Sequence, residues 1–480
     1  MNFIEDVMER APASRLGVVA IDAEGNSREW YFGELIARSA GLSGALAARG
    51  VGRGEVVMTL VGSRIEWVLA MLACFRMGAV AMPCNPQLRR HDLEVRIAAA
   101  EPRICIGQEE LLTEVPEGVP AMDLAEVAGA LDEDLPQETP AEIADLGPED
   151  PAMIIFTSGT TGVPKGVVYP QRYLPGQQLQ ADHWVGAREG DLAWCTAAPG
   201  WSKSSRNVFI APWLRGAAAL IHDARFDPAE RLEILKRERV SVLCQAPTEY
   251  RILAKRAELR PIPSLRRMVS AGEPLNPEVI RHFRERTGIS ICDGYGQTET
   301  GAITGMHPDE DDPALYGSMG RPLPGIETRV VDGELQVKPK SVPTFFSGYL
   351  GEDPFDGEWW STGDHVRQDE DGYLWFEGRD DDIIVTAGYR VGPFEVESAL
   401  VSHPAVAEAA AVPAPDEERG SVVRAIVVLA DGEPSDGLAA ELQEHVKRVT
   451  APYKYPRIVE FADALPKTPS GKIRRAELRG

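Results

Sequence analysis

Apolar residues recur along the first 110 positions in two alternating patterns. Residues 55–61 form a short apolar run typical of a buried strand, and apolar residues then return at the spacing of one helix face between positions 65 and 75. Residues 79–83 are apolar again, and residues 91–107 repeat the same pattern. Strand–helix–strand units of this length predict parallel strands joined by right-handed crossovers. The pattern therefore predicts an α/β fold.

Cap and turn residues mark the ends of two predicted helices. Ser63 and Glu66 have the spacing of a capping box, in which a hydroxyl and a carboxylate satisfy free N–H groups of the first turn. Gly78 is suited to end that helix. Asn276, followed by a proline, predicts the start of a second helix, and Gly288 its end.

The rest of the chain predicts further elements and one connection. A hairpin is expected over residues 327–338, with Asp332-Gly333 at its bend. Residues 109–151 are acidic and rich in proline and alanine, which predicts a surface connection. A helix that opens at Pro393 is also expected. Strands are predicted at 153–156, 265–272, 289–292, 383–390, 422–429 and 457–461, and a helix at 437–449.

Length and composition indicate a globular protein of more than one domain. The chain has 480 residues, of which 44% are hydrophobic and 26% charged. It contains no apolar run of the roughly 20 residues that cross a membrane, and its start lacks the features of a signal peptide. The six cysteines and eight histidines are scattered. We therefore expect reduced thiols, a cytoplasmic location, no transition-metal site, and a monomer or homodimer.

The net charge of −24 argues against nucleic acid or an anionic membrane as the main partner. Binding of any polyanionic ligand would need a local excess of positive charge. Basic residues do gather in the last 35 positions, where a solvated surface is the simpler alternative.

The most informative single stretch is a loop of small residues that follows the apolar run 153–156. Its hydroxyls and glycines leave backbone N–H groups free to surround a polyphosphate, and Lys165 adds a positive charge. The spacing is not that of a Walker loop, and a plain surface turn is the alternative. The loop contains Thr157, Ser158, Gly159, Thr160, Thr161, Gly162 and Lys165.

This loop resembles the phosphate loop of the adenylate-forming superfamily, which contains acyl-CoA synthetases, the adenylation domains of peptide synthetases and luciferases. Further segments resemble the family in the same order and with similar gaps, nearest to the medium-chain acyl-CoA synthetase branch. They are Tyr295-Gly-Gln-Thr-Glu299, Ser361-Thr-Gly-Asp364, Gly378-Arg-Asp-Asp-Asp382, Gly388-Tyr-Arg390 and Pro466-Lys-Thr-Pro-Ser-Gly-Lys472.

The resemblance implies a division into two domains. A large N-terminal domain with stacked sheets and helices would span residues 1–379, and a small mobile α+β domain residues 383–480. Residues 380–382 would form the hinge between them, with Asp381 as the pivot. A polar, exposed residue suits that role, because its backbone can turn without opening a core.

The same resemblance implies the nucleotide site. Thr298 would reach the α-phosphate, and Glu299, with Thr161, would hold Mg²⁺. Asp364 would accept the ribose hydroxyls, and Lys472 would be the catalytic lysine. A solvated glutamate and a turn-capping aspartate are the alternatives from the residues alone. The remaining ATP-binding residues would be Gly272, Glu273, Pro274, Asp293, Gly294, Tyr295, Gly296, Gln297, Arg379 and Arg390.

The implied acyl pocket contains Trp201, Gly272 and Gly296. Amino-acid-activating relatives carry an aspartate in this region for the substrate ammonium, and no comparable residue is found here. Acetate-specific relatives carry a tryptophan at the position of Gly296. A glycine there predicts open space and a medium-length, branched or aromatic acid. Trp201 could equally be a core residue.

The implied reaction has two halves. A carboxylate attacks ATP to give acyl-AMP and pyrophosphate, and the thiol of coenzyme A then takes the acyl group. The alternatives are an enzyme that loads a carrier protein in trans, a luciferase-like oxygenase, and a nucleotide sensor without catalysis. The implied coenzyme A contacts are Ala387, Gly388, Tyr389, Arg419, Lys447 and Tyr455.

Overall fold

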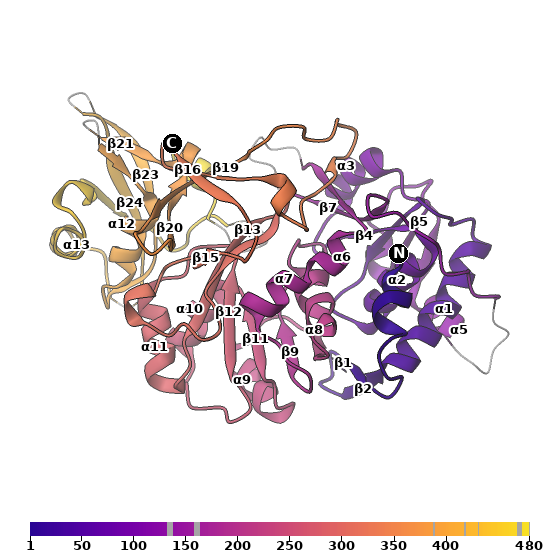
Figure 1. Ribbon diagram of the computed structural model, residues 1–480. Helices are drawn as coiled ribbons and strands as arrows, with labels where there is room; N and C mark the ends of the chain where they lie inside the picture. The colour runs from indigo at the N-terminus through magenta and orange to yellow at the C-terminus, as the bar shows by residue number, and fades with distance from the viewer. Residues whose placement is uncertain are drawn as a thin grey trace.

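The computed structural model describes residues 1–131, 138–157, 164–386, 389–416, 419–430, 432–467 and 473–479, with only the backbone of Arg390 (Figure 1). It has a large N-terminal part with three sheets and a small C-terminal part with two. In the described ranges, no helix is both long and apolar enough to cross a membrane. The α/β fold class and the large-and-small arrangement agree with the sequence-based prediction.

The largest sheet has nine strands, with a parallel centre and antiparallel edges. Its order is β15-β14-β13-β12-β11-β9-β10-β1-β2. The parallel pairs in the centre place the carboxyl ends of β11, β12 and β13 at one edge. The strands are β1 Leu16–Ile21, β2 Ser27–Tyr31, β9 Leu192–Cys195, β10 Ala218–His222, β11 Val242–Gln245, β12 Arg267–Ala271, β13 Ile291–Gln297, β14 Gly301–Gly305 and β15 Arg321–Pro322.

The second sheet has seven strands in the order β18-β8-β7-β4-β3-β5-β6. The pairs among β3, β4, β5, β6 and β7 are parallel, whereas β7 and β8 form an antiparallel pair. The predicted phosphate loop lies between β7 and β8. The strands are β3 Val56–Leu60, β4 Val80–Pro83, β5 Ile104–Gly107, β6 Ala121–Asp123, β7 Pro151–Phe156, β8 Gly166–Pro170 and β18 Gly348–Tyr349.

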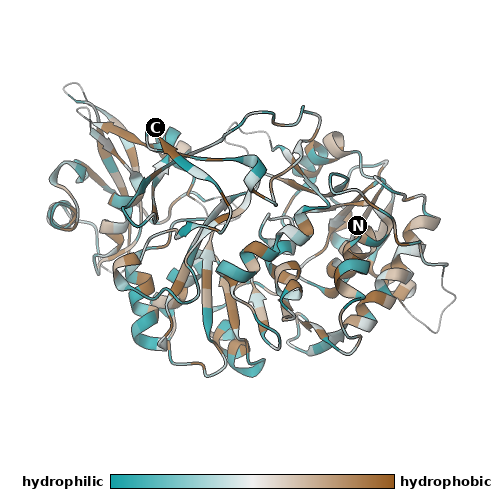
Figure 2. Ribbon diagram, viewed as in Figure 1, coloured by the Kyte–Doolittle hydropathy of each residue, from teal (hydrophilic) through white to brown (hydrophobic). Residues whose placement is uncertain are grey.

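Helices cover these sheets and present hydrophobic residues to them and hydrophilic residues to solvent (Figure 2). α2 is the exception, because every residue from Trp67 to Phe75 is buried. It packs against α1 within the main hydrophobic core. The longer helices of the large part are α1 Phe32–Ala48, α2 Ile65–Met77, α3 Arg90–Ala100, α5 Leu124–Leu131, α9 Pro228–Arg237, α10 Pro247–Arg256 and α11 Pro277–Thr287. The short ones are α4 Glu109–Leu112, α6 Tyr173–Gly176, α7 Gln178–Gln180 and α8 Ala211–Leu214.

A four-stranded antiparallel sheet leads from the large part into the small one. The small part has its own core, built on β23 to β25 with α12 and α13 packed against them. Its hairpin β21–β22 lies far from the seven-stranded sheet (Figure 1). The strands are β16 Thr328–Val331, β17 Glu334–Val337, β19 Trp360–Gln368, β20 Leu374–Arg379, β21 Ile384–Thr386, β22 Tyr389–Val391, β23 Val406–Asp416, β24 Gly420–Leu429 and β25 Ile458–Phe461. The helices are α12 Pro393–Val401, α13 Asp436–Val449 and α14 Arg475–Leu478.

Three predictions about local structure were wrong. α2 begins at Ile65, and its N-cap residue Arg64 makes no side-chain cap bond, so Ser63 and Glu66 do not form a capping box. Asn276 does precede α11, but its side chain donates to Ser398 instead of capping the helix. Residues 109–151 are more than a connection, because they contain α4, α5 and β6, which pairs with β5.

Candidate functional site

The carboxyl ends of β12 and β13 lie side by side and carry two of the predicted nucleotide segments. These strands are parallel, with Ala271 opposite Gly294. Residues 272–274 and 293–297 therefore meet at one edge of the nine-stranded sheet. Gly272 has φ +105°, which glycine adopts without strain.

Asp364 reaches this edge from β19 of the four-stranded sheet. Its Oδ2 accepts hydrogen bonds from the Tyr295 hydroxyl at 2.5 Å and from Nε2 of Gln297 at 3.0 Å. Its Oδ1 lies 3.9 Å from Nε of Arg379, the residue opposite it on β20. Burial raises the pKa of Tyr295 well above its usual range, and the Asp364 carboxylate raises it further. Tyr295 is therefore the donor in this pair.

Thr298 and Glu299 follow β13 and face residues that flank the phosphate loop. Oε1 of Glu299 accepts a hydrogen bond from the Tyr349 hydroxyl at 2.9 Å. Nζ of Lys165 lies over the Tyr349 ring at 4.6 Å and pairs with Glu352 at 2.8 Å. The Thr298 carbonyl accepts from Tyr169 at 2.7 Å. One predicted Mg²⁺ ligand and one predicted phosphate-loop cation thus lie on either side of Tyr349.

The single carboxylate of Glu299 is a suitable protein ligand for the predicted Mg²⁺. Mg²⁺ usually binds proteins through one or two carboxylates and takes its other ligands from phosphates and water. Among the described residues, no group of three or more His, Cys, Asp or Glu side chains could hold a metal by itself. Glu299 would hold Mg²⁺ together with nucleotide phosphates. The second predicted ligand, Thr161, lies outside the described residues, as do Ser158, Gly159, Thr160 and Gly162.

Asp293 is buried at the base of the same edge. Burial raises the pKa of its carboxyl from 3.8 to about 8, while hydrogen bonds from the Gly294 and Leu275 backbones and the charge of Lys203 lower it. The pKa lies near 4 in an unfolded chain. Between about pH 4 and pH 8 the folded protein therefore binds one more proton than the unfolded chain, and stability falls as pH rises through that window.

We expect Asp293→Asn to remove this pH dependence, because asparagine cannot ionise. The variant should match the parent near pH 4 and exceed its stability at pH 8 by about 1 kcal/mol or more, since each unit of pKa shift is worth ~1.4 kcal/mol. Thermal unfolding of both proteins at pH 5 and pH 8 measures the effect. A difference between the two proteins that is the same at both pH values would contradict it.

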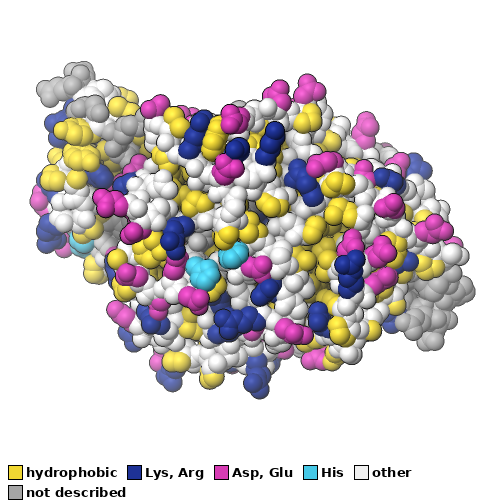
Figure 3. All heavy atoms as spheres, in the orientation of Figure 1, with side chains coloured by type: hydrophobic (Ala, Val, Ile, Leu, Met, Phe, Trp, Pro, Cys, Tyr) yellow, Lys and Arg dark blue, Asp and Glu magenta, His cyan; other side chains and the backbone are white. Residues whose placement is uncertain are grey.

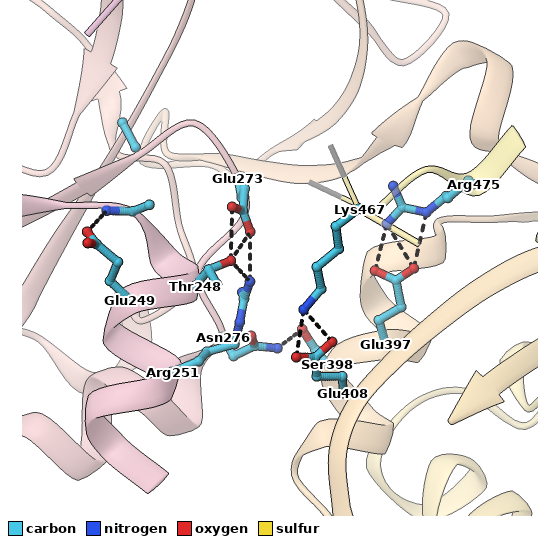
Figure 4. Close-up of polar contacts among 12 residues, drawn as sticks. Thr248, Glu249, Arg251, Glu273, Asn276, Glu397, Ser398, Glu408, Lys467 and Arg475 are labelled. Carbon is cyan, nitrogen blue, oxygen red and sulfur yellow. Dashed lines mark hydrogen bonds and ion pairs between the residues drawn. The ribbon is translucent and has the colours of Figure 1, made fainter. Parts of the chain in front are cut away.

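Glu273 is held in a polar cluster next to the small part of the chain (Figure 4). Its carboxylate accepts from Arg251 at 2.7 Å and from the Thr248 hydroxyl at 3.1 Å. Nearby, Asn276 donates to the Ser398 hydroxyl at 3.0 Å. Nζ of Lys255 donates to the carbonyls of Val406 and Ala407, at 2.9 and 2.6 Å. These polar contacts join α10 and α11 to the small part.

The predicted hinge is tied to the last described segment of the chain. Arg475 forms a bidentate pair with Glu397 at 2.8 Å and lies 3.6 Å from Asp382. Arg479 donates to the Asp381 carbonyl at 2.6 Å. Lys472 itself lies outside the described residues, but its neighbour Ile473 forms a β-bridge with Lys467. Lys467 and Ile473, the described residues on either side of Lys472 in sequence, thus pair with each other in the small part.

The structure brings together only some of the predicted coenzyme A contacts. Nζ of Lys447 lies over the Tyr455 ring at 4.2 Å. Tyr389 is 54% exposed and stacks on Tyr453 with ring centroids 4.6 Å apart. Arg419 lies in the turn between β23 and β24. Ala387 and Gly388 lie outside the described residues, as does the Arg390 side chain.

Comparison with known proteins identifies the family of this chain. The sequence profile of the AMP-binding enzymes matches residues 7–352. The chain belongs to this family. The profile of the AMP-binding enzyme C-terminal domain matches residues 395–472.

Three relatives show what this AMP-binding enzyme resembles. The uncharacterised acyl-CoA ligase YtcI of Bacillus subtilis is 40% identical, over 95% of this chain and 91% of its own. The mitochondrial acyl-coenzyme A synthetase ACSM3 of Mus musculus is 37% identical, over 100% and 90%. The crystal structure of the anthranilate CoA ligase AuaEII with anthranoyl-AMP has a TM-score of 0.89 and 29% identity, over 100% and 96%. This AMP-binding enzyme is an acid–thiol ligase of the acyl-CoA synthetase type that works through an adenylate.

Gly296, a predicted acyl-pocket residue of this AMP-binding enzyme, lies against the backbone of the turn between β13 and β14. A Cβ on Gly296 would overlap the Gly301 carbonyl oxygen and lie 2.8 Å from Cα of Ala302. A side chain at this position would therefore enter the turn between β13 and β14. Gly296 is needed for this close backbone approach, and the open acyl pocket beside it stays a prediction.

We therefore expect Gly296→Ala to lower adenylation of every acid, and Gly296→Trp to lower it further without favouring acetate. Either side chain must displace the Gly301 backbone, which would move Glu299 between them. Pyrophosphate release with acetate and longer acids measures the effect. Gly52→Ala is the matched control, since no atom lies within 4 Å of a Cβ there. A gain in acetate activity in Gly296→Trp would contradict this expectation and support Gly296 as the floor of the acyl pocket.

Two cations without a predicted role, Lys203 and Arg206, lie beside the predicted acyl site. Lys203 donates a hydrogen bond to the Ala271 carbonyl and lies next to Gly272. Arg206 is 4% exposed, three residues further along. Trp201, the predicted pocket residue, is half-buried and begins this turn. The sequence feature that could have indicated these two cations is their position just before the apolar run 208–213.

Proposed function

We propose that this AMP-binding enzyme is an ATP-dependent acyl-CoA synthetase for an organic acid larger than acetate. It would convert the acid and ATP to acyl-AMP and pyrophosphate, and then transfer the acyl group to coenzyme A. The observation that carries the proposal is the meeting of Tyr295, Gln297, Asp364 and Arg379 beside Glu299. Segments about 80 residues apart in sequence supply these groups: an aromatic ring for the base, a carboxylate for the ribose and a cation for the phosphates.

Each of these groups has a role in the first half-reaction. Asp364 would accept hydrogen bonds from the ribose hydroxyls, and the Tyr295 ring would lie against the adenine. Arg379, 44% exposed beside Asp364, would approach the phosphates. The acid needs no general base, because a carboxylic acid is ionised near pH 7.

The main obstacle to this half-reaction is the repulsion between a carboxylate and a triphosphate. Bound Mg²⁺ would supply positive charge at the phosphates. Lys165 and Arg379 supply it from the described residues, and Lys472 would supply it between the two reacting groups. Charges of both signs are mixed on the face shown in Figure 3, so attraction of ATP must come from these local cations.

The second half-reaction would use the small part of the chain. The predicted coenzyme A residues lie on it, and Lys447 with Tyr455 offers a cation and an aromatic ring for a nucleotide. Tyr389, near the tip of the β21–β22 hairpin, is exposed and would line the thiol path after a rotation about the predicted hinge 380–382. The boundaries 1–379 and 383–480 are part of this proposal.

A pyrophosphate-release screen tests the proposal. Purified enzyme with ATP and Mg²⁺ is given medium-chain, branched and aromatic acids, and acetate as the reference. Release that depends on the acid supports acyl activation. Coenzyme A and a phosphopantetheinylated carrier protein are then offered separately as thiols. If a thioester forms with the carrier protein alone, the acyl acceptor is the carrier protein and not coenzyme A. If no acid causes release of pyrophosphate, the proposal is refuted.

A further inference from the structure

Arg206 is a buried cation, and the described residues leave much of its guanidinium group without hydrogen-bond partners. It lies on the helical turn Arg206–Ile210 and is 4% exposed. Within the described part of the chain, its Nε and Nη1 atoms have no hydrogen-bond partner. A guanidinium does not lose its proton in a protein, so Arg206 cannot escape the cost of burial by becoming neutral. A buried charge of this kind normally has an acceptor.

Other polar groups near Arg206 are also buried without a hydrogen-bond partner among the described residues. The Tyr173 hydroxyl is fully buried and has no hydrogen-bond partner among the described residues. Burial raises the pKa of Tyr173, and the charge of Arg206 lowers it, as do polar interactions with the side chains of Tyr169, Arg206 and Gln177. The Tyr173 hydroxyl and the Arg206 guanidinium are therefore close. Oε1 of Gln180 likewise has no partner in the described ranges, while its Nε2 donates to Asn207 at 2.9 Å. Polar groups from α6, α7 and the turn 206–210 thus lie together in the interior.

This cluster adjoins the adenylate site. A Cβ on Gly301 would lie 3.3 Å from Nη1 of Arg206, and Gly301 closes the turn after Glu299. Tyr173 stacks on Tyr169 with ring centroids 4.0 Å apart. Tyr169 in turn donates to the Thr298 carbonyl. Arg206 is therefore one layer of side chains away from the residues predicted to hold the α-phosphate and Mg²⁺.

A hydrocarbon chain would be a poor neighbour for this cluster. It would leave the Arg206 guanidinium and the Tyr173 hydroxyl buried without acceptors, and burying a polar group without a hydrogen bond costs free energy. A carboxylate is a better neighbour, because it accepts two parallel hydrogen bonds from an arginine and neutralises its charge. Lys203, three residues before Arg206, adds a second positive charge next to Gly272.

We propose that Arg206 determines specificity by binding a second carboxylate at the far end of the acid substrate, with the Tyr173 hydroxyl as a further donor. The substrate class is then a dicarboxylic acid, of which one carboxylate is adenylated and the other stays unreacted. This inference rests on the proposed acyl-CoA synthetase activity and narrows its substrate.

Matched acids of equal length test the inference. Pyrophosphate release is measured with adipate against hexanoate, suberate against octanoate, and terephthalate against 4-methylbenzoate. We expect kcat/KM for the dicarboxylate to exceed that of its partner by ~10- to 100-fold, the value of one or two charged hydrogen bonds. ω-Hydroxy acids of the same length show whether a neutral oxygen is sufficient for recognition by Arg206. If the enzyme prefers them to the dicarboxylic acids, the inference of a second carboxylate is overturned.

Arg206→Met assigns the effect to this residue. Its kcat/KM for dicarboxylates should fall by the factor by which the parent enzyme prefers them to monocarboxylates. Its kcat/KM for monocarboxylates should stay constant or rise. Arg206→Lys should keep part of the preference, and Tyr173→Phe should lose part of it. Arg188→Met, at an exposed arginine, is the matched control. The melting temperature of Arg206→Met without substrate should equal or exceed that of the parent, because an unpaired buried charge is removed.

The outcomes separate this inference from the proposed function. Equal use of both acids of each pair, or an equal loss for both in Arg206→Met, overturns the role of Arg206 and leaves acyl activation intact. No release with any acid overturns the proposed function. In that case, a shift in melting temperature by dicarboxylates with a non-hydrolysable ATP analogue tests Arg206 alone. A shift equal in the parent and in Arg206→Met would overturn the inference.

Discussion

Adenylate formation is expected to slow by roughly 10²–10³-fold when Lys472 is replaced by alanine, while thioester formation from supplied acyl-AMP changes far less. In the first half-reaction two anions must meet, and a compact ammonium on a long side chain suits the space between them. Ile473, the described residue that follows Lys472 in sequence, belongs to the small part. Ile473 packs against a cluster there that includes Val412 and Ile426.

Each half-reaction is measured separately. Single-turnover pyrophosphate release reports the first, and consumption of synthetic acyl-AMP with coenzyme A reports the second. Lys467→Ala is the matched control, because it removes a nearby lysine that pairs with Glu408 at 2.7 Å on the surface. Equal losses in both halves for Lys472→Ala would contradict a lysine that acts only on the adenylation side.

The fold could be predicted well wherever apolar runs alternate with helical repeats. The units that give β3, α2, β4 and β5 follow this pattern, and all their strands are parallel as expected. The prediction failed where few residues carry the signal. β6 has three residues inside an acidic stretch and is held by its pairing with β5, which no local pattern reveals.

Side-chain partners were harder to predict than elements, because they depend on distant parts of the chain. Asn276 has the sequence signature of a helix cap, yet its amide donates to Ser398, 122 positions away. Gly296 illustrates the same limit. Its sequence context suggests a pocket floor, whereas the return of the chain at Gly301 fills the position where a side chain would begin.

The candidate site was partly within reach of sequence reasoning. Tyr295, Gln297 and Asp364 belong to motifs whose order in the chain is informative, and the structure does bring them within hydrogen-bonding distance. Arg206 belongs to no such motif. An arginine before an apolar run usually faces solvent, and only the packed structure shows that this one faces inward.

Asp364→Ala is expected to lower kcat/KM for ATP by roughly 10²-fold or more. If Asp364 accepts both ribose hydroxyls, the substitution removes two hydrogen bonds to a charged acceptor, each worth ~1.5–3 kcal/mol. It also leaves the buried Tyr295 hydroxyl and Gln297 amide without one of their acceptors, so the nucleotide surface itself becomes less ordered. Steady-state kinetics with varied ATP at saturating acid measures the loss.

A second nucleotide separates the lost ribose contact from a general loss of structure. The parent enzyme should use 2′,3′-dideoxy-ATP about 10²-fold less well than ATP, because the analogue lacks both hydroxyls. Asp364→Ala should use the two nucleotides almost equally, since the partner of those hydroxyls is gone and the two changes are not additive. If the variant still discriminates as strongly as the parent, the ribose is held by other groups, and Asp364 serves only to position Tyr295 and Gln297.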